Sequence, residues 1–176
     1  PIKKYITEDS DGINWIKIGD TKDINKYIYS TKEKIKPEGV KYSREVKEGD
    51  FILSNSMSFG KPYIMKTSGC IHDGWLLLRR KDNSISEDYL YTVLSSDFIY
   101  KFFQKETIGG VVENLNIELV KKVRIPVPPL NIQMEVSEKL DTAIFEKEEL
   151  EKKAELVLRN AKKDIELILL GEDDEI

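Results

Sequence analysis

The pattern of apolar and polar positions before Leu130 is that of strands and turns. WIKIGD at 15–20 alternates apolar and polar residues and ends in a Gly-Asp turn signal, which predicts a half-buried strand. Three more apolar runs follow closely on one another: EGDFILSNS at 48–56, KPYIMK at 61–66 and CIHDGWLLLRR at 70–80. Strands this close in sequence predict an antiparallel meander.

Other parts of this region lack the spacing of strands. Residues 27–47 are rich in Lys, Glu, Ser and Thr without a sustained period, so loop and short irregular pieces are expected there. Ser86, followed by two acidic residues, predicts a helix that runs to about Lys105, because a serine oxygen caps free amides and acids suit the positive helix end. Its apolar residues recur every three or four positions and predict one buried face: Leu90, Val93, Leu94, Phe98 and Phe102. Further on, Asn114 is expected to cap a short helix, and three prolines hold RIPVPPL at 124–130 extended.

From Asn131 the chain becomes one long helical pattern, without Pro or Gly until Gly171. A narrow stripe at spacings of four and three predicts a coiled-coil seam that pairs with another helix, and its interface residues are Leu140, Ala143, Leu150, Ala154, Val157, Ala161 and Ile168. At about 1.5 Å per residue this helix is roughly 55 Å long, which is too long to be covered entirely by a domain of this size. The alternative is a helix packed along its own domain.

These elements predict an α+β fold in three parts. A mixed, mainly antiparallel β domain with short helices occupies 1–130, one long coiled-coil helix occupies 131–170, and an acidic tail occupies 171–176. Charge divides in the same way, with 19 Lys and Arg against 15 Asp and Glu over 13–130, and 7 against 14 over 131–176. This asymmetry indicates a basic working surface beside an acidic accessory element, although ordinary scatter in charge explains it equally well.

Cysteine content and hydropathy bear on the compartment. One cysteine, Cys70, permits neither an intrachain disulfide nor a thiolate zinc cluster. No apolar run approaches the length of a membrane span, and the N-terminal residues lack the apolar stretch of a signal peptide. A cytoplasmic protein with no membrane association is therefore expected. Because the chain starts at Pro1 without Met, it is interpreted as a possible fragment of a longer protein.

Catalytic patterns are missing from the sequence. The single histidine, His72, stands next to Asp73 in an apparent strand, where neighbouring side chains point to opposite faces, so the two are not expected to pair. The Gly-x-Ser-x-Gly elbow of serine hydrolases, phosphate-binding glycine loops and metal-spaced His or Cys clusters do not occur. No catalytic residue, no cofactor and no metal are expected in this chain.

What remains is a set of side chains suited to DNA. The loop SNSMSFGKPY at 54–63 follows the apolar strand FIL and carries short hydrogen-bonding residues. Asn55, Ser56, Met57, Ser58 and His72 are predicted to read base edges, while Arg44, Lys61, Lys66 and Tyr63 are predicted to bind phosphates. The alternative is an ordinary polar hairpin, with Phe59 in the core and Gly60 at positive φ.

Five segments, in this order, resemble the specificity subunits of type I restriction and modification systems. They are W-x-x-I-G-D at 15–20, VKEGDFILSNS at 46–56, GKPYI at 60–64, IGGVVENLN at 108–116 and IPVPPLNIQ at 125–133. The resemblance implies a target recognition domain that reads one half of a bipartite double-stranded DNA site. It also implies a long helix that sets the distance to a second recognition domain, and catalysis by separate methyltransferase and restriction subunits. One departure is Ile132, where the family commonly has Glu, which puts a polar contact to the methyltransferase in doubt.

The same resemblance leaves the organisation of the whole protein open. The usual subunit has two recognition domains and two helices, whereas this chain has one of each, so it looks like a half subunit. It would then form a homodimer or pair with a second recognition domain through the long helix. Two alternatives are the recognition domain of a single-chain type II restriction-methylation enzyme and a coiled-coil adaptor that binds proteins only.

Overall fold

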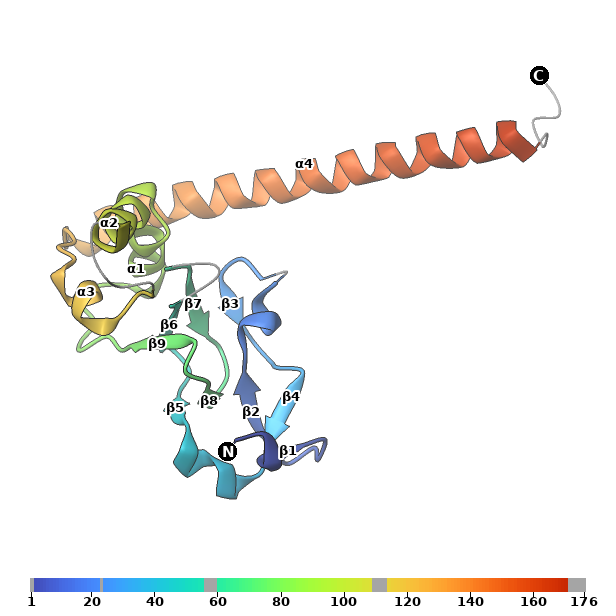
Figure 1. The fold of residues 1–176 in the computed structure, drawn as a ribbon. Helices are drawn as coiled ribbons and strands as arrows, with labels where there is room; N and C mark the ends of the chain where they lie inside the picture. Colours follow the sequence, from blue (N-terminus) through green and yellow to red (C-terminus); the bar gives the residue numbers. More distant parts are fainter. Residues whose placement is uncertain (1, 23, 56–59, 109–113, 171–176) are drawn as a thin grey trace. The chain divides into compact units, whose positions relative to one another are not determined.

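The computed structural model describes residues 2–22, 24–55, 60–108 and 114–170. The chain divides into two compact units, residues 1–134 and residues 135–176. The described residues of the first unit form two β-sheets and several short helices, and those of the second unit belong to one long helix (Figure 1).

Five strands in the order β1-β4-β2-β8-β5 form the first sheet, sheet A. They are β1 (Ile6–Thr7), β2 (Ile13–Ile16), β4 (Glu33–Ile35), β5 (Arg44–Val46) and β8 (Gly69–Ile71). Strands β2 and β8 pair in parallel, with Trp15 opposite Cys70, and the other neighbours pair antiparallel. Trp15, Ile35 and Cys70 are buried together and form the core of this sheet.

Four strands in the order β3-β7-β6-β9 form the second sheet, sheet B. They are β3 (Tyr27–Ile28), β6 (Phe51–Ser54), β7 (Pro62–Met65) and β9 (Trp75–Leu78). Every residue of β6 and β7 is buried, because both faces of this part of the sheet are covered. One core joins β6, β7 and β9 to Ile16 and Ile71 of sheet A, and a second core packs Leu53 against residues of the helices that follow.

The α+β fold class is confirmed, and so is the antiparallel pairing of the first two strands of the predicted meander, β6 and β7, but the place predicted for the third strand is wrong. CIHDGWLLLRR divides at a turn after His72 into β8 and β9, which belong to different sheets. Strand β6 lies between β7 and β9, with Phe51 opposite both Ile64 and Leu78. A run of apolar residues does not reveal the turn that sends its two halves to different partners.

Three short 3-10 helices occur among the described residues: η1 (Ile2–Tyr5), η2 (Ile18–Thr21) and η3 (Pro37–Tyr42). Of these, η2 lies in the predicted strand and η3 in the predicted irregular stretch. The strand predicted at 15–20 ends at Ile16, because Lys17 N donates a 2.8 Å hydrogen bond to Asp20 Oδ2 and closes a turn. The irregular stretch predicted at 27–47 is wrong in part, since it contains β3, β4, η3 and β5.

Three short helices complete the first unit: α1 (Glu87–Leu94), α2 (Asp97–Ile108) and α3 (Ile117–Lys122). In Figure 1 they gather beside sheet B. Ser86 caps α1 as predicted, with its side chain accepting from Tyr89 N. The single helix predicted to Lys105 is divided between α1 and α2, and this rotates Phe98 out of the predicted buried face, leaving it 70% exposed. Asn116, and not Asn114, caps α3.

The proline segment leads into the first turn of the last helix, where Gln133 is fully buried. Its Oε1 accepts from Ser86 N at 2.8 Å, and its Nε2 donates to Ser84 O and Pro128 O at 2.8 Å each. These hydrogen bonds join the first turn of the helix to residues 84–86, the segment before α1, within the first unit. A buried amide with partners at both ends favours one arrangement of these segments.

The long helix, α4 (Leu130–Leu170), is one continuous element of 41 residues. Continuity follows from the lack of Pro and Gly, and Lys139–Glu135 and Lys147–Glu151 ion pairs at i,i+4 spacing support it. Its apolar side chains past residue 140 are largely exposed, with Leu150 at 65% and Val157 at 69%.

Candidate nucleic-acid interface

The predicted recognition loop connects β6 and β7. These two strands pair as an antiparallel hairpin, and their side chains are buried. Ser54 N donates to Lys61 O at 3.1 Å, and the buried Ser54 hydroxyl accepts from Lys61 N at 3.2 Å. Gly60 has a φ of +73°, and a Cβ there would lie 2.9 Å from the Phe103 ring, so glycine suits this position. Ser56, Met57 and Ser58, predicted to read bases, lie outside the described residues, as does Phe59.

Asn55 holds a neighbouring turn. Its Nδ2 donates to Asp73 O at 2.8 Å, and its backbone N–H donates to Gly74 O at 3.0 Å. The turn at 72–74 therefore rests against the end of β6. This geometry gives the Asn55 amide a positioning role, and a contact to a base edge would have to use the second N–H of Nδ2 or the Oδ1 acceptor if the bond to Asp73 is kept.

The prediction that His72 and Asp73 cannot pair is wrong, because they lie in a turn and not in a strand. His72 Nδ1 is 3.5 Å from Asp73 Oδ1. The same nitrogen accepts from Gly74 N at 2.6 Å, and the ring is tilted against Trp15 and Trp75, with centroids 6.2 and 6.4 Å away. A Cβ on Gly74 would lie 2.2 Å from His72 Cε1, so a larger residue would displace the ring.

Burial determines the charge of this imidazole. Desolvation lowers the pKa of His72, and the nearby Asp73 carboxylate opposes this shift without reversing it. Protonation would also place an N–H on Nδ1 against the N–H of Gly74. His72 therefore presents a neutral ring near pH 7, which is not attracted to phosphate. Its Nδ1 accepts from Gly74 N at 2.6 Å and its Nε2 from Ile18 N at 3.4 Å, so a hydrogen bond to a base edge would compete with these backbone partners.

We expect His72 to titrate below the ordinary histidine pKa of about 6.5. Since the unfolded chain then binds the proton more readily, the stability from the neutral ring is complete above about pH 6.5 and is lost as pH falls towards the folded pKa. Because the chain has one histidine, its imidazole NMR signals give this pKa directly. A His72→Gln variant should lose this share of the pH dependence of the free energy of unfolding. A titration midpoint of the His72 NMR signals at or above about pH 6.5 would contradict the expected lowering of its pKa.

Three of the four predicted phosphate ligands are engaged within the fold. The phosphate role predicted for Tyr63 is wrong. Tyr63 is 1% exposed and packs edge-on against Trp75, so its hydroxyl is not available to a phosphate. Lys66 pairs with Glu87 at 3.1 Å, and Lys61 Nζ donates to Ile24 O at 3.3 Å. A phosphate contact by either lysine would compete with these partners.

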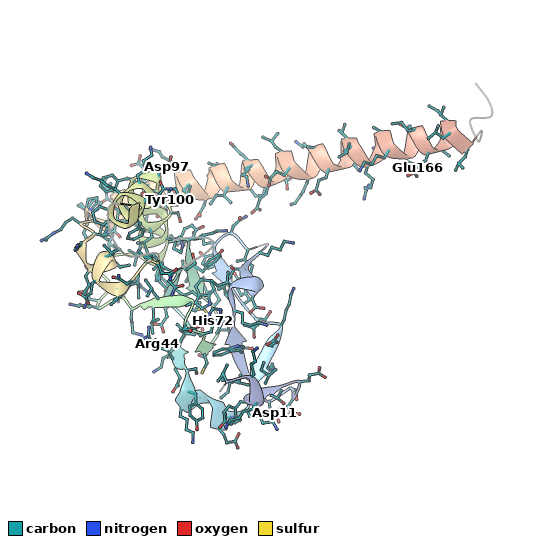
Figure 2. All side chains as sticks on the ribbon, viewed as in Figure 1. Asp11, Arg44, His72, Asp97, Tyr100 and Glu166 are labelled. Atoms are coloured by element: carbon teal, nitrogen blue, oxygen red, sulfur yellow. The ribbon has the colours of Figure 1, made fainter. Side chains whose placement is uncertain are left out.

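Arg44 and His72 come together, although they are 28 positions apart. Arg44 pairs with Ile71 across β5 and β8, one residue before His72, and both side chains line one cavity of about 500 Å³. Figure 2 shows the two labelled side chains in the same region of the first unit. The walls of this cavity include Trp15, Tyr42 and Trp75, which the sequence did not identify as site residues. The only signal was their aromatic character, which equally predicts a core.

Among the described residues, no three His, Cys, Asp or Glu side chains gather as a metal ion requires. None of the helices in the same part of the chain is long and apolar enough to cross a membrane.

Comparison with known proteins identifies the class to which this fold belongs. Residues 1–159 match the type I restriction modification DNA specificity domain, and the chain belongs to this family. The structure is similar to that of the HsdS subunit from Thermoanaerobacter tengcongensis, with a TM-score of 0.60 and 19% identity over 81% of this chain and 32% of the other.

Two further solved structures share the fold. One, described as showing complex assembly and conformational transition of the type I R-M system, has a TM-score of 0.59 and 18% identity over 97% of this chain and 39% of the other. The type I restriction-modification S subunit from M. genitalium has a TM-score of 0.51 and 14% identity over 91% of this chain and 42% of the other. The chain thus spans between a third and somewhat over two fifths of the length of these proteins.

Proposed function

We propose that this chain recognises one half of a bipartite DNA site as the specificity component of a type I restriction-modification complex. The match of residues 1–159 to the DNA specificity domain carries this proposal. The chain itself would be non-catalytic, with methyl transfer and cleavage performed by methyltransferase and restriction subunits. In this reading, residues 1–130 form the recognition domain and residues 131–170 the spacing helix.

The cavity region and the hairpin supply the proposed contacts to DNA. Asn55, Ser56, Met57, Ser58 and His72 remain candidates for base reading, with Asn55 acting through the turn that it holds. Arg44 is exposed, and no hydrogen bond or ion pair of its side chain is found with other described residues, so its guanidinium group is available to DNA. The amino groups of Lys61 and Lys66, in contrast, have partners within the fold.

The exposed face of α4 supports a helix partner. Ala143, Leu150, Ala154, Val157 and Ala161 are all exposed in the single chain, and they lie on one stripe. Exposed apolar residues repeated at this spacing are stabilised when a second helix covers them. The partner would be a second copy of this chain or a second recognition domain, and α4 would set the distance between two half-sites.

The salt dependence of DNA binding tests the proposal. If four phosphates are neutralised, log K should fall against log salt with a slope of about −3.6, so affinity drops about 100-fold between roughly 50 and 200 mM salt. Fluorescence anisotropy of the purified chain with labelled duplex measures this slope. Binding that is absent at low salt would reject DNA recognition and would leave a role in protein binding.

A further inference from the structure

The 500 Å³ cavity is lined by one cationic side chain, one anionic side chain and two tryptophans. Arg44 comes from β5 and Asp73 from the turn between β8 and β9, while Trp15 belongs to β2 and Trp75 to β9. Both tryptophans are nearly fully buried, at 5% and 2% exposed, whereas Arg44 and Asp73 are exposed. The two charged side chains are therefore the part of this lining that a ligand from solvent reaches first.

Two features of the backbone hold this pair in place. The antiparallel register of β5 and β8 puts Arg44 opposite Ile71, two positions before Asp73. The carbonyl groups of Asp73 and Gly74 accept the two hydrogen bonds from Asn55. Both side chains therefore project from elements whose backbones are fixed, which is a requirement for reading a base pair rather than a diffuse charge.

Neither charged side chain has a strong partner in the fold. The Arg44 backbone belongs to the pairing of β5 with β8, but no hydrogen bond or ion pair of its guanidinium group is found among the described residues. The Asp73 side chain is fully exposed, and the partner found for it is His72 at 3.5 Å, whose ring is held neutral. This contrasts with Arg79 and Arg80, which are paired to Asp50 and Glu87. A donor and an acceptor that line one cavity without a strong partner in the fold are available to a ligand that carries both a complementary acceptor and a complementary donor.

We infer that Arg44 and Asp73 together read one G·C base pair from the major groove. In this arrangement the Arg44 guanidinium donates to guanine O6 and N7, and the Asp73 carboxylate accepts from cytosine N4. A phosphate would satisfy Arg44 but would be repelled by Asp73, so this pair favours a base edge over the backbone. The inference revises the predicted phosphate role of Arg44.

Phosphate contacts then fall to the neighbouring lysines. Tyr5 and Tyr42 stack with ring centroids 5.4 Å apart, and Lys4 and Lys41 each lie about 5 Å over one of these rings. Tyr42 also lines the cavity, so the Lys41 amino group over its ring lies near this lining. Cations beside a base-reading pair are what a duplex requires, since the phosphates on either side of the groove lie near the base edge.

This inference rests on the proposed function, and selection from a random duplex library by the purified full chain tests it. The wild type should enrich a half-site with a G·C pair at one fixed position. Arg44→Ala and Asp73→Ala should each reduce the preference at that same position by about 5- to 150-fold and leave the other positions unchanged. Lys41→Ala should lower the recovery of all sequences alike.

Glu45→Ala is the matched control, because Glu45 is the neighbouring exposed carboxylate on β5 and points to the opposite face of the strand. It should leave the enriched sequence unchanged. The inference is overturned if the enriched half-site has no fixed G·C pair, if the two variants relax different positions, or if both weaken every sequence alike. A wild type that enriches no sequence at all instead rejects the proposed function and this inference together.

Discussion

Leu150→Asp in α4 is expected to dissociate the helix pairing proposed for this chain. Leu150 lies in the middle of the stripe and is 65% exposed in the single chain, so a partner helix would bury it. An aspartate there would have to be buried without a compensating charge, at a cost of about 3 to 5 kcal/mol. That cost weakens association by more than about 100-fold. Sedimentation velocity over a range of concentrations measures the change.

Leu156→Asp is the matched control for this experiment. It adds the same charge to the same helix, but six positions later, which is about 120° away around the axis and off the stripe. Leu156 is also exposed, at 46%. Circular dichroism should show the same helix content for both variants. Equal loss of assembly in the two, or an unchanged mass for Leu150→Asp at low concentration, would contradict pairing through this face.

DNA affinity separates assembly from recognition. On a duplex with a single half-site, Leu150→Asp should bind as the wild type does, because the predicted reading residues belong to the first unit. On a duplex with both half-sites it should bind more weakly, since two linked contacts raise the effective concentration of the second. A loss on the single half-site would mean that the substitution acts through the recognition domain.

Local signals in the sequence predicted the elements that depend on few residues. The α4 helix follows from a long stretch free of Pro and Gly, and the cap at Ser86 follows from one hydroxyl before two acids. The break between α1 and α2 had a weaker signal of the same kind, since Ser96 precedes Asp97 and its hydroxyl accepts from Ile99 N at 3.4 Å. It was missed because serine is also tolerated inside helices. Asn114 and Asn116 are equally good caps on chemical grounds, and packing of Leu115 and Leu119 in one core decides between them.

Apart from the antiparallel pairing of β6 with β7, strand partners could not be predicted, because they depend on contacts far apart in sequence. The parallel pairing of β2 with β8 joins Trp15 to Cys70, and nothing within either run specifies the other. The phosphate role predicted for Tyr63 rested on residue type, which does not show whether a side chain is buried. In β7 both faces are covered, and the tyrosine is buried with its neighbours.

The candidate site was predicted by residue type and not by geometry. Arg44 and His72 were selected as DNA contacts, and the register of β5 and β8 then brought them to one cavity. Lys61 and Lys66 were selected on the same grounds, but they have partners within the fold. A charged residue in a sequence does not reveal whether the fold already satisfies it, and this decides which cations remain for a ligand.

Trp75→Ala is expected to destabilise the first unit by about 3 to 5 kcal/mol, because it leaves a large cavity in the core. Trp75 is 2% exposed and packs edge-on against Tyr63, with ring centroids 5.7 Å apart. Its Nε1 donates to Ile16 O at 3.2 Å, so this side chain of sheet B is bonded to a strand of sheet A. The free energy of unfolding of a domain of this size is about 5 to 15 kcal/mol, so the expected loss is a large share of its stability.

Trp75→Phe distinguishes packing from the bond between sheets. Phenylalanine keeps most of the buried ring but removes the indole N–H, which leaves Ile16 O without this donor at a cost of about 1 to 3 kcal/mol. Urea unfolding followed by fluorescence of the other tryptophan, Trp15, reports on the first unit in both variants, since Trp15 is buried in sheet A. A change below about 1 kcal/mol for Trp75→Ala would mean that the sheets are held together without this side chain. The cavity lined by Arg44 and Asp73 would then owe little of its stability to Trp75, which also lines it.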